Sequence, residues 1–178
     1  SKNDQYHEQI QSHAKLHFIK GGSSRAESVK KGFDFLDSDD FKYDNILIHD
    51  SARPCLTESE LRRMLKSFSD NKFQALILAL PVSDTLKQSD GNLIQSTINR
   101  TNVWRALTPQ LFTKESLKIA YNSNKESLGK ITDEASLFDN LDEEIMIMKG
   151  SSENIKITFK EDLKLAETIL LNQKRIHI

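Results

Sequence analysis

The chain has 178 residues, the length of one domain, and its charge is nearly balanced, with 25 Lys and Arg against 26 Asp and Glu. This balance argues against nucleic acid and a membrane surface as partners. Cys55 is the only cysteine, which excludes an intrachain disulfide and favours a reducing cytoplasm. The five histidines show no metal-site spacing. No apolar run of about 18 residues or leader pattern predicts a membrane span or signal peptide.

The first half of the chain alternates predicted strands and helices after a polar segment, 1–13. Two capping boxes, Ser24 with Glu27 and Thr57 with Glu60, mark the helix starts. Apolar residues then recur at helical spacing, whereas the strands are short apolar runs. The predicted elements are a strand over 16–20, a helix over 24–36, a strand over 46–49, a helix over 58–68 and a strand over 75–80. This alternation indicates an α/β fold with a mostly parallel sheet.

A hairpin interrupts that alternation. Two extended stretches, 85–88 and 93–98, flank a turn that contains Asp90 and Gly91, which is a strong hairpin signal. An isolated two-stranded hairpin is only marginally stable in water. We therefore expect the segment 82–103 to be an arm that packs on something else, such as another subunit.

The second half continues with helices and shorter strands. Thr113 is expected to open a helix, Thr132 to cap another, and Thr158 with Glu161 to form a last capping box. The predicted elements are a helix over 113–121, a loop over 125–130, a helix after 132, strands over 145–148 and 155–158, and a helix over 161–171. The sequence shows no repeat and no linker, so we expect a single domain over 1–178.

The stretch ILIHDSARPCL places polar residues directly after a buried strand. Asp50 and Arg53 would lie at the carboxyl end of that strand, where open α/β sheets bind ligands. A structural turn in which Asp50 and Arg53 pair only with each other remains the alternative.

The stretch GGSSRAES precedes the first of these helices. Backbone N–H groups at Gly21 and Gly22, with the helix dipole, would stabilise an anion or nucleotide by about 0.3–1 kcal/mol. The stretch is neither a P-loop nor a GxGxxG fingerprint, so a tight turn is the alternative. Arg25 and Ser28 lie within the first helical turn and can face such a ligand.

Lys156 lies in the otherwise apolar stretch NIKIT, so its side chain must point to solvent or into a wet cleft. A Lys or Arg bond to phosphate contributes about 1.5–3 kcal/mol. Lys156, Arg100 and threonine hydroxyls would form a clamp for a phosphomonoester. From its residues alone, the sequence therefore predicts an α/β domain with a site for a phosphate compound.

Six stretches, in order and spacing from about Phe18 onward, resemble the 2-C-methyl-D-erythritol 4-phosphate cytidylyltransferases of the non-mevalonate isoprenoid pathway. They are GGSSRAESV, ILIHDSARPCL, LPVSDTLK, WRALTPQLF, ITDEAS, and GSSENIKIT followed by EDLKLAE. The resemblance implies a Rossmann-like, mostly parallel nucleotide-binding sheet with helices on both faces and a protruding hairpin arm. It also implies a homodimer in which the arm, 82–103, embraces the second subunit, with each active site built from both chains.

The resemblance implies roles for individual residues. Contacts with the nucleotide would come from Gly22, Ser23, Ser28 and Asp50, and contacts with the polyol phosphate from Asp50, Arg53, Thr85, Arg100, Thr108, Thr132 and Lys156. Thr85 and Arg100 would reach the partner's site. Arg100 and Lys156 resemble the pair that positions the polyol phosphate for attack, and we expect these two to be catalytic.

The implied reaction joins CTP and 2-C-methyl-D-erythritol 4-phosphate, with pyrophosphate leaving. The attacking phosphate is already an anion, so catalysis would rest on positioning and on charge neutralisation by Lys, Arg and magnesium. Magnesium would be held mainly by the CTP phosphates, and the location would be cytoplasmic. A ribitol 5-phosphate cytidylyltransferase is the nearest alternative.

The family begins with a strand and a loop of the form AAGxGxRM, followed by a PKQ segment, and this sequence contains neither. We expect that this segment exists outside the sequence, because a sheet without its first strand would expose apolar edges. The alternatives are a truncated, non-catalytic nucleotide-binding or dimerisation module, and an α/β domain with no ligand site.

Overall fold

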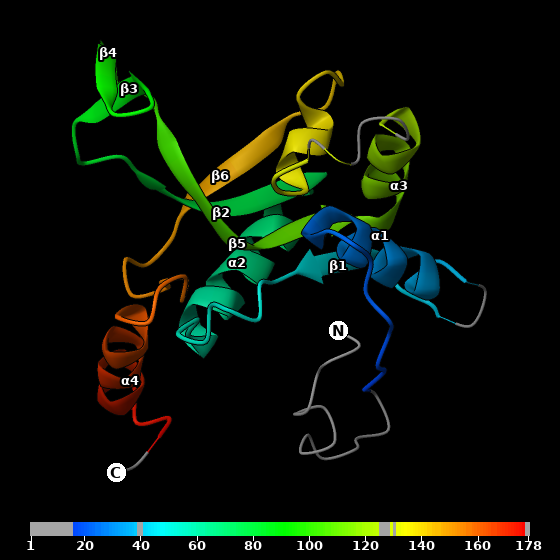
Figure 1. Cartoon of the computed structure of the whole chain (residues 1–178). Helices are drawn as coiled ribbons and strands as arrows, with labels where there is room; N and C mark the ends of the chain where they lie inside the picture. The colour runs from blue at the N-terminus through cyan, green and yellow to red at the C-terminus, as the bar shows by residue number, and fades with distance from the viewer. Residues whose placement is uncertain (1–15, 39–40, 125–128, 130, 177–178) are drawn as a thin grey trace. The chain divides into compact units, whose positions relative to one another are not determined.

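The computed structural model describes residues 16–38, 41–124, 129 and 131–176, and it divides the chain into two compact units (Figure 1). One unit combines residues 1–44 with 114–142, and the other combines 45–113 with 143–178. The predicted polar segment 1–13 and all of the predicted loop 125–130 except residue 129 lie outside the described residues. The single domain over 1–178 stays a prediction.

The helical elements in the described residues of the first unit are α1 (Arg25–Leu36), α3 (Lys114–Ser123) and the 3-10 helix η3 (Ala135–Phe138). Ser24 caps α1 as predicted, since its hydroxyl accepts a hydrogen bond from the N–H of Glu27 at 3.1 Å. The rings of Phe33 in α1 and Tyr121 in α3 pack with centroids 5.3 Å apart.

Two predictions for the first unit are wrong. The segment 16–20 forms no strand, because an extended segment becomes a strand only when a neighbouring strand pairs with it. Thr132 does not cap a helix: Asp133 accepts the N–H of Ser136 at 3.1 Å, and only the short η3 follows. Glu134 occupies the capping position of η3 without a capping side-chain bond, and Asp133, one residue before it, bonds the first turn instead.

The second unit is built on a four-stranded sheet with the order β1-β5-β2-β6 (Figure 1). Its strands are β1 (Asn45–Ile48), β5 (Trp104–Thr113), β2 (Ala75–Pro81) and β6 (Ile145–Lys149). β5 runs antiparallel to both β1 and β2, whereas β6 runs parallel to β2. Three strands therefore share one direction and β5 opposes them. The α/β fold class is confirmed, and the sheet is mixed.

The helix α2 (Glu58–Asn71) packs on one face of this sheet. Thr57 caps it as predicted, with its hydroxyl accepting the N–H of Glu60 at 3.2 Å. The core between helix and sheet consists of buried apolar side chains at alternate strand positions and at helical spacing: Met64, Phe68, Leu76, Leu78, Leu107 and Leu111. This core fixes the strand ends that carry the candidate site.

The strand β5 was not predicted, and its register explains why. Ile77 of β2 pairs with Gln110, but Ala79 pairs with Ala106, so β5 contains extra residues between these pairs. The bulge includes Thr108 and Pro109, which are joined by a cis peptide bond. Proline has no N–H for a sheet ladder, and the pair reads as a turn in sequence.

Two predictions near the C-terminus are also wrong. Residues 155–158 form no strand, although the N–H of Ile157 donates to the carbonyl of Ala52 at 2.8 Å. Thr158 does not cap the last helix, α4 (Asp162–Asn172). Instead, Asp162 accepts the N–H groups of Thr158 and Phe159, because its carboxylate reaches back over the turn.

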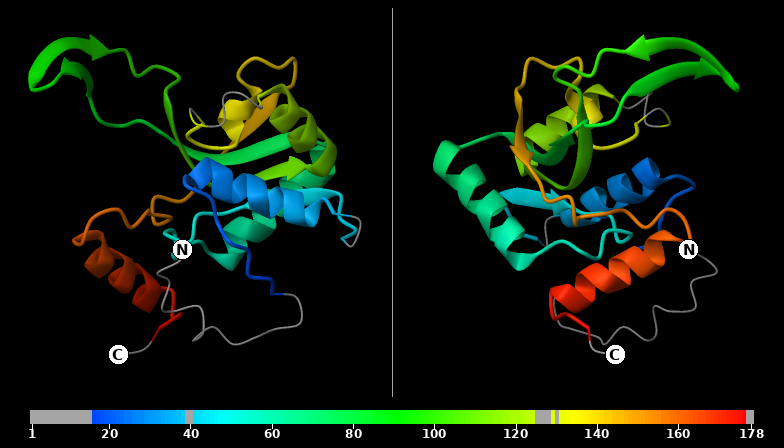
Figure 2. Two further views of the ribbon diagram at one scale, coloured as in Figure 1. Left: turned by 45° about the vertical axis from the view of Figure 1, so that its right-hand side comes forward. Right: turned by 90° about the vertical axis from the view of Figure 1, so that its left-hand side faces the viewer.

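The predicted hairpin is present as β3 (Leu86–Asp90) and β4 (Leu93–Ile98), which pair with each other and form a sheet of their own (Figure 2). Gly91 lies in the turn with φ of 54°. This left-handed conformation suits glycine, which has no Cβ to clash. Every residue of β4 is exposed in the single chain.

Candidate functional site

Asp50 is the centre of a charged cluster at the end of β1. The backbone turns directly after the strand, with the N–H of Arg53 donating to the carbonyl of Asp50 at 3.0 Å. Lys156 donates to Oδ2 of Asp50 at 3.0 Å, and Nε of Arg53 lies 3.9 Å from the same oxygen. The structure therefore brings together three of the predicted site residues from segments that lie far apart in sequence.

A backbone carbonyl group holds the side chain of Arg53 in place. Its side chain is 10% exposed, and Nη1 donates to the carbonyl of Asn154 at 2.8 Å. Burial lowers the pKa of Arg53, while the nearby Asp50 carboxylate opposes this change. An arginine remains protonated under these conditions, so the site holds a fixed, partly desolvated positive charge.

Asn154 belongs to the site and was not predicted. It is 1% exposed, and its side-chain amide donates to the carbonyl of Thr108 at 2.9 Å while its own carbonyl accepts from Arg53. Asn154 thus ties the segment that leads to Lys156 to strand β5. The only sign in the sequence was an asparagine next to an apolar stretch, and this pattern does not reveal which residue the side-chain amide contacts.

Thr108, another of the predicted site residues, lies beside Asp50. Its hydroxyl accepts the N–H of Asp50 at 2.9 Å and lies 3.0 Å from Nδ1 of His49. His49 was not predicted to take part in the site. Because His49 directly precedes Asp50, its imidazole ring lies beside the turn, and Nε2 lies 3.0 Å from the carbonyl of Arg53.

This cluster offers complementary groups for a phosphorylated polyol. Lys156 is 45% exposed, so its ammonium is accessible to an anion. The Asp50 carboxylate accepts hydrogen bonds, as polyol hydroxyls require, and the Arg53 guanidinium donates them. Asp50 and Lys156 form an ion pair at 3.0 Å.

The predicted nucleotide contacts Gly22, Ser23 and Ser28 lie together in the first unit. The Ser28 hydroxyl accepts the N–H of Gly22 at 2.9 Å and donates to the carbonyl of Ser24 at 2.8 Å. Glu27 folds back over the turn, so a Cβ at Gly22 would lie only 2.4 Å from its carboxyl carbon. The turn has no room for another residue at this glycine.

A buried ion pair supports the same unit. Arg25 donates through two nitrogens to the two carboxylate oxygens of Glu134, both at 2.9 Å. The Glu134 side chain is fully buried; burial raises its pKa, and Arg25 opposes that rise. The predicted contact Thr132 is exposed two residues earlier. Sequence reasoning missed this pairing between segments 109 residues apart.

Thr85 and Arg100 stand apart from these groups. Both are exposed at the base of the hairpin, where the N–H of Val103 donates to the carbonyl of Arg100. Among the contacts of the described residues, none joins either side chain to the cluster around Asp50. Their predicted roles require a second chain.

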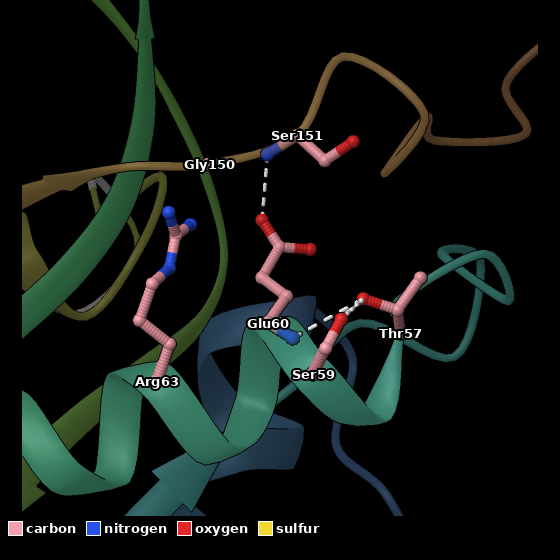
Figure 3. A pocket seen from close by; sticks show the side chains of 6 residues that line it. All are labelled: Thr57, Ser59, Glu60, Arg63, Gly150 and Ser151. Carbon is pink, nitrogen blue, oxygen red and sulfur yellow. Dashed lines mark hydrogen bonds between the residues drawn. The ribbon is translucent and has the colours of Figure 1, made fainter.

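A pocket of about 390 Å³ lies between the start of α2 and the segment after β6 (Figure 3). Within it, Glu60 accepts the N–H of Ser151 at 2.6 Å, and Arg63 donates to the carbonyl of Lys149 at 2.8 Å. Gly150 permits this approach, since a Cβ there would lie 2.9 Å from Leu107. Helix α2 thereby fixes the start of the segment that ends at Lys156.

The part of the chain that the structure describes contains no group of three or more His, Cys, Asp or Glu side chains able to hold a metal ion. The carboxylate of Asp50 is a suitable oxygen donor chemically, but in this cluster it faces Lys156 and Arg53. The nearest groups thus favour an anion over a bare cation.

Comparisons with known proteins agree with one another. The family model described as IspD, 2-C-methyl-D-erythritol 4-phosphate cytidylyltransferase, matches residues 1–172. The enzyme of that name from Haemophilus ducreyi is 42% identical over 174 residues, which cover 97% of this chain and 74% of the relative. Its namesake from Wigglesworthia glossinidia brevipalpis is 43% identical over 163 residues, covering 90% and 68%.

Solved structures give the same result. The crystal structure of the Francisella tularensis 2-C-methyl-D-erythritol 4-phosphate cytidylyltransferase superposes with a TM-score of 0.81 at 32% identity, over 90% of this chain and 74% of that one. The match thus extends over both sequence and fold. The chain belongs to the 2-C-methyl-D-erythritol 4-phosphate cytidylyltransferase family.

Proposed function

We propose that this protein transfers a cytidylyl group from CTP to 2-C-methyl-D-erythritol 4-phosphate, in isoprenoid precursor biosynthesis. A phosphate oxygen of the polyol attacks the α-phosphorus of CTP, and the bond to pyrophosphate breaks. The products are 4-diphosphocytidyl-2-C-methyl-D-erythritol and pyrophosphate. Family membership over residues 1–172 supports this reaction.

The observation that carries the proposal is the meeting of Asp50, Arg53, Thr108 and Lys156 in one cluster. These residues come from the end of β1, the bulge of β5 and the segment after β6. The Asp50 carboxylate can accept hydrogen bonds from polyol hydroxyls, and the neighbouring Lys156 ammonium can bind a phosphate. Together they complement the two ends of a polyol phosphate.

The main obstacle to the reaction is repulsion between two anions. Lys156 would exchange Asp50 for the substrate phosphate, and Asp50 would then be available to the polyol hydroxyls. Arg53 would hold its charge in place through Asn154. Such preorganised cations lower the barrier without reorganising during the reaction. Gly22, Ser23 and Ser28 would contact the nucleotide, and Thr132 would complete the polyol phosphate pocket.

Magnesium would be bound mainly through the CTP phosphates, which supply the hard oxygen ligands that this ion prefers. When bound, it would neutralise charge on the triphosphate. The protein's own part is to bind and orient the two anions.

A homodimer through the hairpin arm is part of the proposal. β4 presents apolar side chains to solvent in the single chain, with Leu93 71% and Ile94 66% exposed. An apolar, unsupported hairpin is best explained by a partner that covers it. Thr85 and Arg100, at the base of the arm, would then serve the partner's site, Arg100 as a catalytic cation.

Among the described residues, no helix is both long and apolar enough to cross a bilayer. A cytoplasmic location stays a prediction, which the single cysteine supports.

The test is a pyrophosphate-release assay on the protein produced from its complete gene, with CTP, magnesium and 2-C-methyl-D-erythritol 4-phosphate. Lys156→Met should lower kcat/KM by about 100-fold or more, because it removes a cation that faces the reacting phosphate. Lys160→Met, a nearby exposed lysine, is the matched control and should retain activity. Absence of pyrophosphate release by the unaltered protein would contradict the proposal.

Ribitol 5-phosphate is the second substrate to assay, since polyol choice rests on few contacts. Turnover of ribitol 5-phosphate with a higher kcat/KM than the methylerythritol compound would replace the proposed substrate by this one.

A further inference from the structure

His49 occupies an unusual position beside the Asp50–Arg53 turn. One ring nitrogen, Nε2, lies 3.0 Å from the backbone carbonyl of Arg53, at the end of the turn. The other, Nδ1, lies 3.0 Å from the hydroxyl of Thr108, which in turn accepts the N–H of Asp50, at the beginning of the turn. The ring therefore connects both ends of the turn, and through Thr108 it connects them to β5.

The directions of these hydrogen bonds follow from their partners. A carbonyl oxygen only accepts, so Nε2 of His49 must carry the hydrogen and donate to Arg53. In a neutral imidazole Nδ1 then has a lone pair and accepts. The hydroxyl of Thr108 must donate to it. The resulting chain runs from the N–H of Asp50 through Thr108 and His49 to the carbonyl of Arg53.

This chain of hydrogen bonds occupies the hydroxyl hydrogen of Thr108 and one lone pair of its oxygen. Its single hydrogen points to His49, and its oxygen already accepts the N–H of Asp50. Phosphate oxygens without hydrogens only accept, so Thr108 in this arrangement has no hydrogen to offer them. Thr108 is also buried, with 4% of its surface exposed. Its hydroxyl thus holds the turn, and its remaining lone pair can accept a hydrogen bond from a polyol hydroxyl.

We propose that His49 is a positioning residue for the polyol phosphate: acting through Thr108 and the carbonyl of Arg53, it holds Asp50 and Arg53 in the geometry that binds this substrate. This inference rests on the proposed function for the identity of the substrate. The hydrogen-bond chain itself can be tested without any substrate.

The first experiment examines the chain in the free protein by NMR. Long-range proton–nitrogen spectra of the imidazole distinguish the Nε2–H tautomer, which we expect, from the Nδ1–H tautomer. The Asp50 amide should exchange with solvent about tenfold faster or more in His49→Phe and Thr108→Val than in the unaltered protein, because the acceptor of that amide is released or removed. An Nδ1–H tautomer, or an unchanged Asp50 amide in both variants, would overturn the proposal.

The second experiment compares Michaelis constants for the two substrates. His49→Phe should raise KM for the polyol phosphate by about 10- to 100-fold, since small displacements of binding groups have effects of this size. KM for CTP should remain within about twofold. His17→Phe, a histidine in the first unit, is the matched control and should change neither constant.

Two further variants separate positioning from a merely structural role. Thr108→Val should reproduce the effect of His49→Phe, and the double variant should be no worse than either, because both changes break one chain. His49→Asn, whose amide oxygen can accept from Thr108, should recover most of the affinity. Equal loss for both substrates with a lower unfolding midpoint would overturn the proposal. An inactive unaltered protein would contradict the proposed function alone, since the NMR results would still decide the role of His49.

Discussion

Hydrogen bonds from Ser23 are the largest influence on the pKa of the exposed Glu27 side chain. Its Oε2 accepts both the backbone N–H of Ser23, at 2.7 Å, and the Ser23 hydroxyl, at 2.6 Å. These bonds, with Lys31, lower the pKa of Glu27 from 4.5 to about 2. The Glu27 carboxylate, with the Ser28 hydroxyl that accepts the N–H of Gly22, holds the Gly22-Ser23 turn against the first turn of α1.

The sign of the resulting pH dependence follows from linkage. A carboxyl group whose pKa is lower in the folded protein stabilises the fold fully above its unfolded pKa, and this contribution is lost as the pH falls through the folded value. Glu27 should therefore support the turn above about pH 4.5 and cease to do so as the pH falls to about 2.

Ser23→Ala should raise the pKa of Glu27 toward 4.5, because the variant removes the strongest of these bonds. Titration of the Glu27 carboxyl carbon by NMR measures the change. Ser38→Ala, whose hydroxyl donates to the carbonyl of Phe35, is the control and should leave the pKa of Glu27 unchanged. A Glu27 pKa near 4.5 in the unaltered protein would contradict the hydrogen-bonded turn.

Charged residues of the site could be predicted from sequence, whereas its supporting residues could not. Asp50 directly follows an apolar strand, and Lys156 interrupts an apolar stretch, so both charges stand out in the sequence. His49 and Asn154 both bond to Thr108, which lies 59 and 46 residues away from them. Only the fold brings these partners together, so their spacing carries no local signal.

At the scale of elements, helix starts and tight turns could be predicted because neighbouring residues determine them. The caps Ser24 and Thr57, the helices that they start and the Gly91 turn were predicted correctly. The glutamate half of each predicted capping box bonds elsewhere, Glu27 to Ser23 and Glu60 to Ser151. Strand β5 was missed because its bulge at Thr108 and Pro109 depends on pairing with β1 and β2. Sheet partners, unlike helix caps, lie far away in sequence.

The hairpin arm gives a prediction at this scale. Replacing Leu93 and Ile94 by lysine should convert the proposed dimer into a monomer, because two charges would have to be buried in an apolar interface. Sedimentation velocity measures the change. The exposed Leu163 of α4 serves as control, and Leu163→Lys should leave the mass unchanged. A dimer that persists in the arm variant would show that the subunits meet elsewhere.

At the scale of the whole molecule, each unit is assembled from two separate stretches of chain. Residues 1–44 are completed by 114–142, and residues 45–113 are completed by 143–178. In the first unit, the bidentate pair of Arg25 and Glu134 joins the two stretches. The predicted nucleotide contacts other than Asp50 lie in this unit, and most predicted polyol contacts lie in the other.

Glu134→Ala should therefore destabilise the first unit. Loss of a fully buried partner costs about 3–5 kcal/mol, and we expect about 2–3 kcal/mol here because Arg25 can return to water. Urea unfolding followed by circular dichroism measures the free energy. Glu115→Ala, at an exposed position of α3, should change it by less than about 0.5 kcal/mol. Equal effects of the two substitutions would mean that the pair does not hold the unit together.

The alternation of these stretches also determines when each unit can form during synthesis. The ribosome delivers the opening stretch of the first unit, then most of the sheet, and only afterwards α3 and η3. β6, the partner of β2, is made after both. A stretch of the other unit interrupts each unit in sequence, so neither unit can be complete until that stretch has been synthesised. A single cut between residues 44 and 45 would split the first unit and leave all of the second in one fragment, and a cut between 142 and 143 would do the reverse. A cut between 113 and 114 would split both units.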